Sequence, residues 1–129
     1  MKKMLLTFAL FSLLQSVATA EPIMRAGVLA DPTGRTLYIF DKDTPGKSNC
    51  SGACLAAWPA FVAKDGAQAT GDFSLLDANG VKQWAFKGKP LYYFAGDTQA
   101  GERNGENSGG VWHTVSGHAA KPAAAKSTY

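Results

Sequence analysis

An internal repeat constrains this 129-residue chain more than any other feature. Residues 34–44 read GRTLYIFDKDT and residues 88–98 read GKPLYYFAGDT, so six of eleven positions are identical at a constant offset of 54. The same offset pairs Trp58 with Trp112. Related units that each contribute a hairpin usually pack into one core, because neither can bury its apolar face alone. The sequence therefore predicts one small domain made of two related halves. The repeat extends over about 34–58 and 88–112.

The strand inside each repeat reads Leu-Tyr-x-Phe, and every residue in it is apolar or aromatic. Side chains alternate between the two faces of a strand, so Tyr38 and Phe40 share one face while Leu37 and Ile39 share the other. A strand that is apolar on both faces is expected in the centre of a fold rather than at its edge. The second repeat has the same pattern, with Tyr92 and Phe94 on one face and Leu91 and Tyr93 on the other.

An Asp-Thr pair follows the Phe of each repeat by three residues. The two acidic residues are Asp43 and Asp97, and each precedes a Gly-rich loop. An aspartate in this position can accept hydrogen bonds from backbone N–H groups of the loop and close an Asx-type turn. We therefore expect a structural role for both aspartates, with direct contact to a ligand as the alternative.

Turn residues separate short apolar runs along most of the chain. The pair Asn79-Gly80 is the strongest short-range hairpin signal. Short strands with such frequent turns predict a mainly-β fold, a small antiparallel sheet domain from two hairpin-containing halves. Helix-favouring residues that end before Pro59 predict one short helix near 51–58. The candidate strands are 23–29, 36–40, 73–76, 81–86, 91–94 and 111–115, and 63–72 is expected to be a surface loop. The expected shared core contains Tyr38, Phe40, Trp58, Trp84, Phe86, Tyr92, Phe94 and Trp112.

The first twenty residues have the pattern of a secretory signal peptide. Lys2 and Lys3 precede an apolar run, and Ala18-Thr19-Ala20 is a typical small-residue cleavage site. The apolar run is about half the ~20 residues that a spanning helix needs, so we expect cleavage near Ala20 and no membrane span in the mature chain. An uncleaved anchor is the alternative. No Cys lies near the cleavage site, so no lipid anchor is expected. The assignments are residues 1–20 as signal peptide, 21–116 as a single mainly-β domain and 117–129 as a flexible tail.

The charge balance gives no support to a nucleic-acid partner. The chain has 13 Lys and Arg against 10 Asp and Glu, a formal net charge of +3. Loss of Lys2 and Lys3 with the signal peptide reduces this to +1, and the remaining basic residues are scattered. We therefore expect an envelope partner or a small ligand instead.

Cys50 and Cys54 are the only cysteines. In an exported chain, such a pair most simply forms a disulfide. The alternative is a copper or thiol-redox site, because soft thiolates suit Cu(I) and Met24 or His113 could complete the ligand set. Leu55 weakens this alternative, since periplasmic copper chaperones with a similar pair have Pro after the second Cys.

No catalytic motif is evident. The sequence lacks Gly-x-Ser-x-Gly and His-Glu-x-x-His. Asp41 and Asp43 open a segment that resembles a calcium loop, but Pro45 takes a ligand position and Gly52 replaces the closing Glu. A lone His on a strand, such as His113, is more often structural than a ligand. We therefore expect neither enzymatic activity nor a resident cofactor.

Both repeats match the pattern Tyr-x-(Phe/Trp/Tyr)-x-x-Asp through Tyr38, Phe40 and Asp43 and through Tyr92, Phe94 and Asp97. Together with the segments 50–59 and 109–113, this resembles a bacterial family of secreted repeats and predicted lipoproteins whose biochemical role is not established. The resemblance covers about residues 25–115. It implies an extracytoplasmic protein, periplasmic or secreted, although this chain lacks the lipobox Cys of a lipoprotein.

These observations favour a non-catalytic, exported domain that binds a ligand or partner or serves a structural role. The binding surface would be formed by the Gly- and Asn-rich loops 41–53 and 95–110. Because these loops follow equivalent strands, they could lie on the same side of the domain. The copper or thiol-redox protein based on Cys50 and Cys54 is the second hypothesis, and a hydrolytic enzyme is the weakest.

Overall fold

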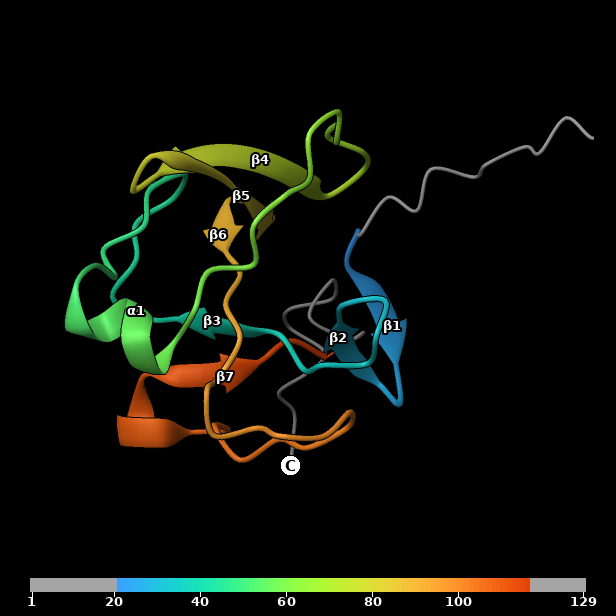
Figure 1. Cartoon of the computed structure of the whole chain (residues 1–129), viewed down its shortest axis with the longest axis vertical. Helices are drawn as coiled ribbons and strands as arrows, with labels where there is room; N and C mark the ends of the chain where they lie inside the picture. The colour runs from blue at the N-terminus through green and yellow to red at the C-terminus, as the bar shows by residue number, and fades with distance from the viewer. Residues whose placement is uncertain (1–20, 117–129) are drawn as a thin grey trace, which may run out of the picture.

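The computed structural model describes residues 21–116, so the expected signal peptide and tail lie outside the described residues. Small antiparallel sheets make up most of the regular structure, with a short helix at the left edge of the domain in Figure 1, which confirms the mainly-β fold. Helix α1 lies within the expected range 51–58. The elements are β1 (Ile23–Arg25), β2 (Val28–Ala30), β3 (Tyr38–Phe40), α1 (Ala53–Ala57), β4 (Phe73–Ala78), β5 (Val81–Phe86), β6 (Lys89–Pro90), the 3-10 helix η1 (Ser108–Gly110) and β7 (Trp112–Thr114).

One of the sheets pairs a strand near the beginning of the domain with the last strand of the domain. In the described part of the chain, β1 pairs with β2, β3 pairs with β7, and β4, β5 and β6 form a third sheet in that order. All pairings are antiparallel. The β3–β7 sheet joins the two halves directly, because it places Phe40 opposite Trp112.

An approximate two-fold axis relates the halves and passes between Tyr38 and Tyr92. The N–H group of each residue donates to the carbonyl oxygen of the other, with N···O distances of 2.8 and 2.9 Å. Further backbone bonds repeat at nearly the same offset. Gly46 donates to the carbonyl of Gly88 at 2.8 Å, and Gly101 donates to that of Gly34 at 3.0 Å. The sequence repeat is therefore a structural repeat.

The core has two layers, one on each face of the central strand segments. Tyr38, Phe40, Tyr92 and Phe94 lie in one layer, as the alternation predicts. Both layers contain residues from both halves, so the expected single core is divided, and Leu76, Ala78 and Ala85 form a small third cluster. Trp84 and Phe86 belong to the other layer. The buried members of that layer are Leu29, Leu37, Phe61, Trp84, Leu91 and Val115.

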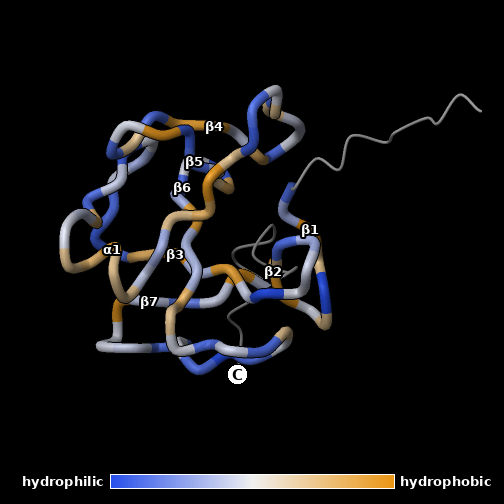
Figure 2. Tube along the Cα trace, viewed as in Figure 1, coloured by the Kyte–Doolittle hydropathy of each residue, from blue (hydrophilic) through white to orange (hydrophobic). Residues whose placement is uncertain are grey.

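Two expected strands differ from the structure. The segment 23–29 is a hairpin, because Ala26 and Gly27 adopt positive φ angles of 50° and 86° and reverse the chain. The segment 91–94 is not a regular strand. Tyr92 forms isolated bridges to Tyr38 on one side and Ala60 on the other, so pairing extends over a single residue. The loop before β4, at the upper right of Figure 1, is largely hydrophilic in Figure 2.

Candidate functional site

The tyrosines and aspartates of the repeat motif bond across the two halves. The Tyr38 hydroxyl donates to Asp97 Oδ2 at 2.6 Å, and the Tyr92 hydroxyl donates to Asp43 Oδ2 at 2.8 Å. Each half thus supplies the tyrosine of one pair and the aspartate of the other. Tyr38, Tyr92 and Asp97 are buried, whereas Asp43 is partly exposed. The motif therefore fastens the two halves together.

The second oxygen of each aspartate organises the loop that follows. Asp43 Oδ1 accepts the N–H of Asn49 at 2.6 Å, and Asp97 Oδ1 accepts the N–H of Asn104 at 2.8 Å. Burial and the neighbouring carboxylates raise the pKa of both Tyr38 and Tyr92, so both hydroxyls stay protonated as donors. Burial also raises the pKa of Asp43. With both oxygens of each carboxylate engaged, the motif offers no open general base.

Four aromatic rings form a continuous stack through the same layer. The rings of Trp58 and Trp112 lie parallel with centroids 3.8 Å apart. Phe40 stacks on Trp112 at 4.1 Å, and Phe94 stacks on Trp58 at 4.4 Å. Each phenylalanine therefore contacts the tryptophan of the other half. The aromatic stack therefore links the two halves in the same way as the Tyr–Asp pairs, with each residue contacting a partner in the other half.

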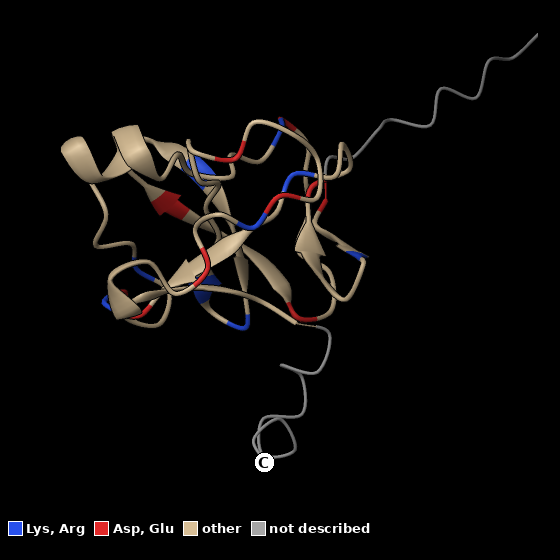
Figure 3. Ribbon diagram, turned by 90° about the horizontal axis from the view of Figure 1, so that it is seen from below, with Lys and Arg blue, Asp and Glu red and all other residues tan. Residues whose placement is uncertain are grey.

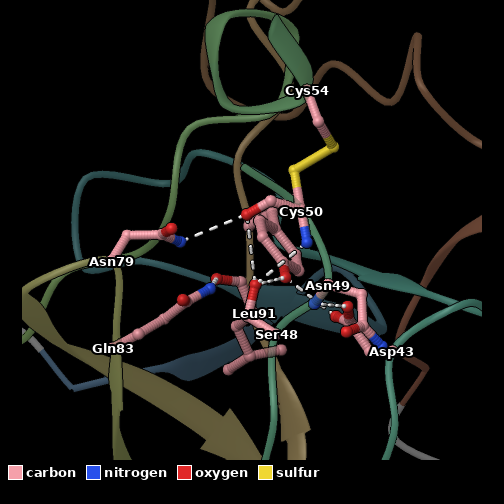
Figure 4. The surroundings of a disulfide bond; sticks show 9 residues. Asp43, Ser48, Asn49, Cys50, Cys54, Asn79, Gln83 and Leu91 are labelled. Atoms are coloured by element: carbon pink, nitrogen blue, oxygen red, sulfur yellow. Dashed lines mark hydrogen bonds between the residues drawn. A yellow bond between two sulfur atoms is a disulfide. The ribbon is translucent and has the colours of Figure 1, made fainter. Parts of the chain in front are cut away.

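Cys50 and Cys54 form a disulfide that joins the loop 41–53 to α1 (Figure 4). Cys50 is fully buried. Asn79, in the β4–β5 turn, donates to the carbonyl of Cys50 at 3.2 Å, and Ser48 Oγ accepts the Cys50 N–H at 3.2 Å. The same Ser48 oxygen lies 2.6 Å from the Tyr92 hydroxyl. The disulfide therefore belongs to the network around the second tyrosine.

The other half closes the equivalent turn without a disulfide. Gly105 takes the place of Cys50, and its N–H donates to the Tyr38 hydroxyl at 3.1 Å. A Cβ atom on Gly105 would lie 2.7 Å from the Trp58 ring, so a side chain cannot fit there without a shift. One half thus uses a disulfide where the other uses close contact between backbone and aromatic rings.

Replacing both cysteines in the variant Cys50→Ala/Cys54→Ala is expected to lower the free energy of unfolding by about 2 kcal/mol, because the closed loop is very short. The contacts of Ser48 and Asn79 remain, so the variant should still fold. Urea denaturation monitored by circular dichroism measures the loss. Wild-type protein treated with a reducing agent should show the same loss. An unfolded double variant would contradict this prediction.

The other candidate ligands lie elsewhere in the fold. His113 Nε2 lies 2.7 Å from Asp41 Oδ2, and its Nδ1 lies 3.8 Å from Glu106 Oε2. Met24 is exposed on β1. Within residues 21–116, no group of three or more His, Cys, Asp and Glu side chains could hold a metal ion. In the structure, the two sulfur atoms are bonded to each other.

A third tyrosine–aspartate pair escaped the sequence analysis. The Tyr93 hydroxyl donates to Asp31 Oδ2 at 2.7 Å, and the Arg35 guanidinium carbon lies 4.1 Å from the centroid of the Tyr93 ring. The N–H groups of Thr33 and Arg35 both donate to Asp31 Oδ1 at 2.9 Å. No sequence signal marked this cluster, because Ile39 replaces Tyr93 in the first repeat.

These hydrogen bonds predict a pH dependence of stability. Although burial disfavours the charged form, the bonds from Thr33, Tyr93 and Arg35 hold the pKa of Asp31 below its ordinary value. A carboxyl group with a lowered folded-state pKa contributes stability above its unfolded pKa and loses it as pH falls through the folded value. We expect Asp31→Asn to have a flatter decline of melting temperature below about pH 4 than wild type. Asp77→Asn, at an exposed site, should retain the wild-type decline, and an unchanged profile in Asp31→Asn would contradict the prediction.

The loops 41–53 and 95–110 pack against different hairpins. The first contacts the β4–β5 and β5–β6 turns through Cys50 and Gly46. The second contacts the β1–β2 turn, where Arg103 Nη2 donates to the carbonyl of Ala26 at 2.6 Å. Charged residues of both signs are scattered over the domain (Figure 3). Neither loop therefore carries a single-sign surface.

Residues 26–62 and 75–116 match the sequence profile of the Lipoprotein_15 family, described as a secreted repeat of unknown function. The chain belongs to this family. Its matched segments start before Gly34 and Gly88, so each secreted-repeat unit includes hairpin residues that precede the motif strand. Residues 26–62 include β2, β3 and α1, and 75–116 include β5, β6 and β7.

The family assignment is consistent with the disulfide, since disulfides persist in extracytoplasmic compartments. No curated protein and no solved structure gives a significant match to this chain. None of the helices within residues 21–116 has the length and apolar character needed to span a bilayer. The hydrogen bonds between the tyrosines and aspartates of the motif are therefore the basis for assigning it a structural role.

Proposed function

We propose that this secreted-repeat chain is a non-catalytic, ligand- or partner-binding domain of the bacterial periplasm, released by cleavage near Ala20. One observation carries the non-catalytic part: the motif tyrosines and aspartates bond to each other across the halves, at 2.6 and 2.8 Å. These residues hold the two halves of the domain together, and residues outside the motif bind the ligand or partner. The family description as a secreted repeat supports the export.

The disulfide supports a structural rather than a metal-binding role for the cysteines. Cys50 is buried beside Ser48 and Asn79, and its sulfur is bonded to that of Cys54. A Cu(I) site would need both thiolates, so the bond would first have to be reduced. The bonded state also suits an oxidising compartment such as the periplasm.

Thiol counting, metal analysis and a ligand screen on protein exported by its own signal sequence test the proposal together. We expect no alkylatable thiol in the native protein, no stoichiometric copper, and a rise in melting temperature with at least one envelope-derived small molecule that is recovered unchanged. Stoichiometric Cu(I) that is lost in Cys50→Ser would overturn the proposal. Chemical conversion of a bound compound by the purified domain would also overturn it.

A further inference from the structure

An open cavity lies between β3, the loop that follows it and the β5–β6 turn. Its volume is about 290 Å³, and its lining includes Ile39, Asp41, Pro45 and Lys89. Cavities of this size suit a single small ring. The lining combines apolar surface with two cations, Lys87 and Lys89, and two carboxylates, Asp41 and Asp43, which is the composition of a ligand site rather than of a packing defect.

The two-fold relation of the halves shows what fills the equivalent position on the other side. The offset of 54 pairs Ile39 with Tyr93 and Lys89 with Arg35. Around Tyr93 of the second half, the Arg35 guanidinium carbon lies 4.1 Å from the ring centroid, and the Tyr93 hydroxyl donates to Asp31 at 2.7 Å. That site contains a phenol ring beneath a cation, with a carboxylate to receive its hydroxyl.

The site around Ile39 keeps the cation of the Tyr93 site but neither its ring nor its carboxylate, because Ala85 corresponds to Asp31. Ile39 is shorter than Tyr93, so the volume of the phenol group remains open beside Lys89. Asp41 stands where the second half has Ala95, and adds a carboxylate that the second half lacks at this position. Its Oδ2 is engaged by His113 at 2.7 Å.

We propose that this cavity binds a phenolic ring, supplied by a small molecule or by a tyrosine side chain of a peptide. The ring lies against Ile39 and Pro45 and beneath the Lys89 ammonium, as the Tyr93 ring lies beneath Arg35. Its hydroxyl donates to Asp41 Oδ1. Cation–π attraction and a hydrogen bond to a charged acceptor supply the recognition. This inference rests on the proposed binding function and names its ligand class.

Saturation-transfer NMR on the full mature chain tests the ligand chemistry with p-cresol, the side-chain analogue of tyrosine. The expected Kd is on the order of 1 mM, as for other fragments of this size. Toluene lacks the hydroxyl and 4-methylcyclohexanol lacks the aromatic ring, so each should bind about tenfold more weakly. Equal binding of all three compounds would overturn the proposal. A capped Gly-Tyr-Gly peptide that binds more tightly than p-cresol identifies a peptide source, and weaker binding of the peptide identifies a free phenol.

Two variants locate the site. Ile39→Tyr gives the first half the ring that Tyr93 gives the second, so it should abolish p-cresol binding while the melting temperature stays at or above the wild-type value. Lys89→Gln should weaken binding about threefold, because it removes the cation above the ring. Lys64→Gln, which does not line this cavity, is the matched control.

Full p-cresol binding by both Ile39→Tyr and Lys89→Gln would place the site elsewhere and overturn the inference. If Ile39→Tyr does not fold, the comparison of Lys89→Gln with Lys64→Gln decides. Absence of p-cresol binding in the wild type would also overturn the inference. In that case, a different compound that stabilises the domain in the ligand screen would still support the proposed binding function, so the two failures are distinguishable.

Discussion

Replacement of Trp112 by Ala is expected to lower the free energy of unfolding by about 4 kcal/mol. The ring of Trp112 stacks on Trp58 at 3.8 Å and on Phe40 at 4.1 Å, and the Tyr92 ring lies perpendicular to it with the centroids 5.2 Å apart. Truncation therefore leaves a cavity in the middle of the stack. Domains are typically stable by only about 5–15 kcal/mol, so the variant should be marginally folded. Urea denaturation of the oxidised protein, monitored by circular dichroism, measures the loss.

The internal symmetry supplies a matched variant. Trp58→Ala should cost about the same as Trp112→Ala, because each tryptophan lies between its partner and one phenylalanine. The double variant should cost less than the sum, since the first truncation already breaks the stack. Val81→Ala, at an exposed position, should change stability by less than about 0.5 kcal/mol. Strict additivity, or a loss no larger than that of Val81→Ala, would show that the rings do not act as a unit.

Those features of the fold that depend on local periodicity could be predicted from the sequence. Alternation alone placed Tyr38 and Phe40 on one face and Leu37 and Ile39 on the other, and the two core layers confirm it. Likewise, the helix-favouring residues before Pro59 predicted α1 close to its observed bounds. In both cases, the determining interactions lie within a few residues of each other.

The partners of the motif residues could not be predicted in the same way. A constant offset shows that Tyr38 and Tyr92 are equivalent, but it does not show whether each bonds the aspartate of its own half or of the other. The antiparallel bonding of Tyr38 with Tyr92 decides this, because it brings each tyrosine to the opposite loop. The turn in β1–β2 was missed for a local reason. Gly27 is a turn residue, but Ala26 before it adopts a positive φ that its side chain disfavours, so the pair lacks the signal of an Asn-Gly turn.

The cavity beside β3 also depends on the relation between the halves. The exchange of Tyr93 for Ile39 is visible in the sequence as one of five mismatches among eleven aligned positions. Its meaning becomes clear only when Arg35 is found above the Tyr93 ring and Lys89 beside an open volume. The proposed phenol site therefore depends on a difference between the halves that shows its consequence only in three dimensions.

Replacement of Asp97 by Ala is the second change with a large expected effect, a loss of about 3 kcal/mol in the free energy of unfolding. It removes the acceptor for the Tyr38 hydroxyl at 2.6 Å and for the N–H of Asn104 at 2.8 Å. Tyr38 is fully buried, so its hydroxyl would be left without either this partner or water. Urea denaturation at neutral pH measures the effect.

The equivalent variant in the other half shows how burial of the aspartate affects the loss of stability, because the two positions correspond in the repeat but differ in exposure. Asp43→Ala removes the same two kinds of hydrogen bond, but Asp43 is partly exposed and water can replace its carboxylate. It should therefore cost less than Asp97→Ala. Asp77→Ala breaks only an exposed ion pair with Lys82 and should cost at most about 1 kcal/mol. Combining Tyr38→Phe with Asp97→Ala should cost less than the sum of the two, because the hydroxyl left unpaired in the single variant is then absent. If Asp97→Ala is as mild as Asp77→Ala, the motif does not hold the halves together, and the structural role assigned to it is wrong.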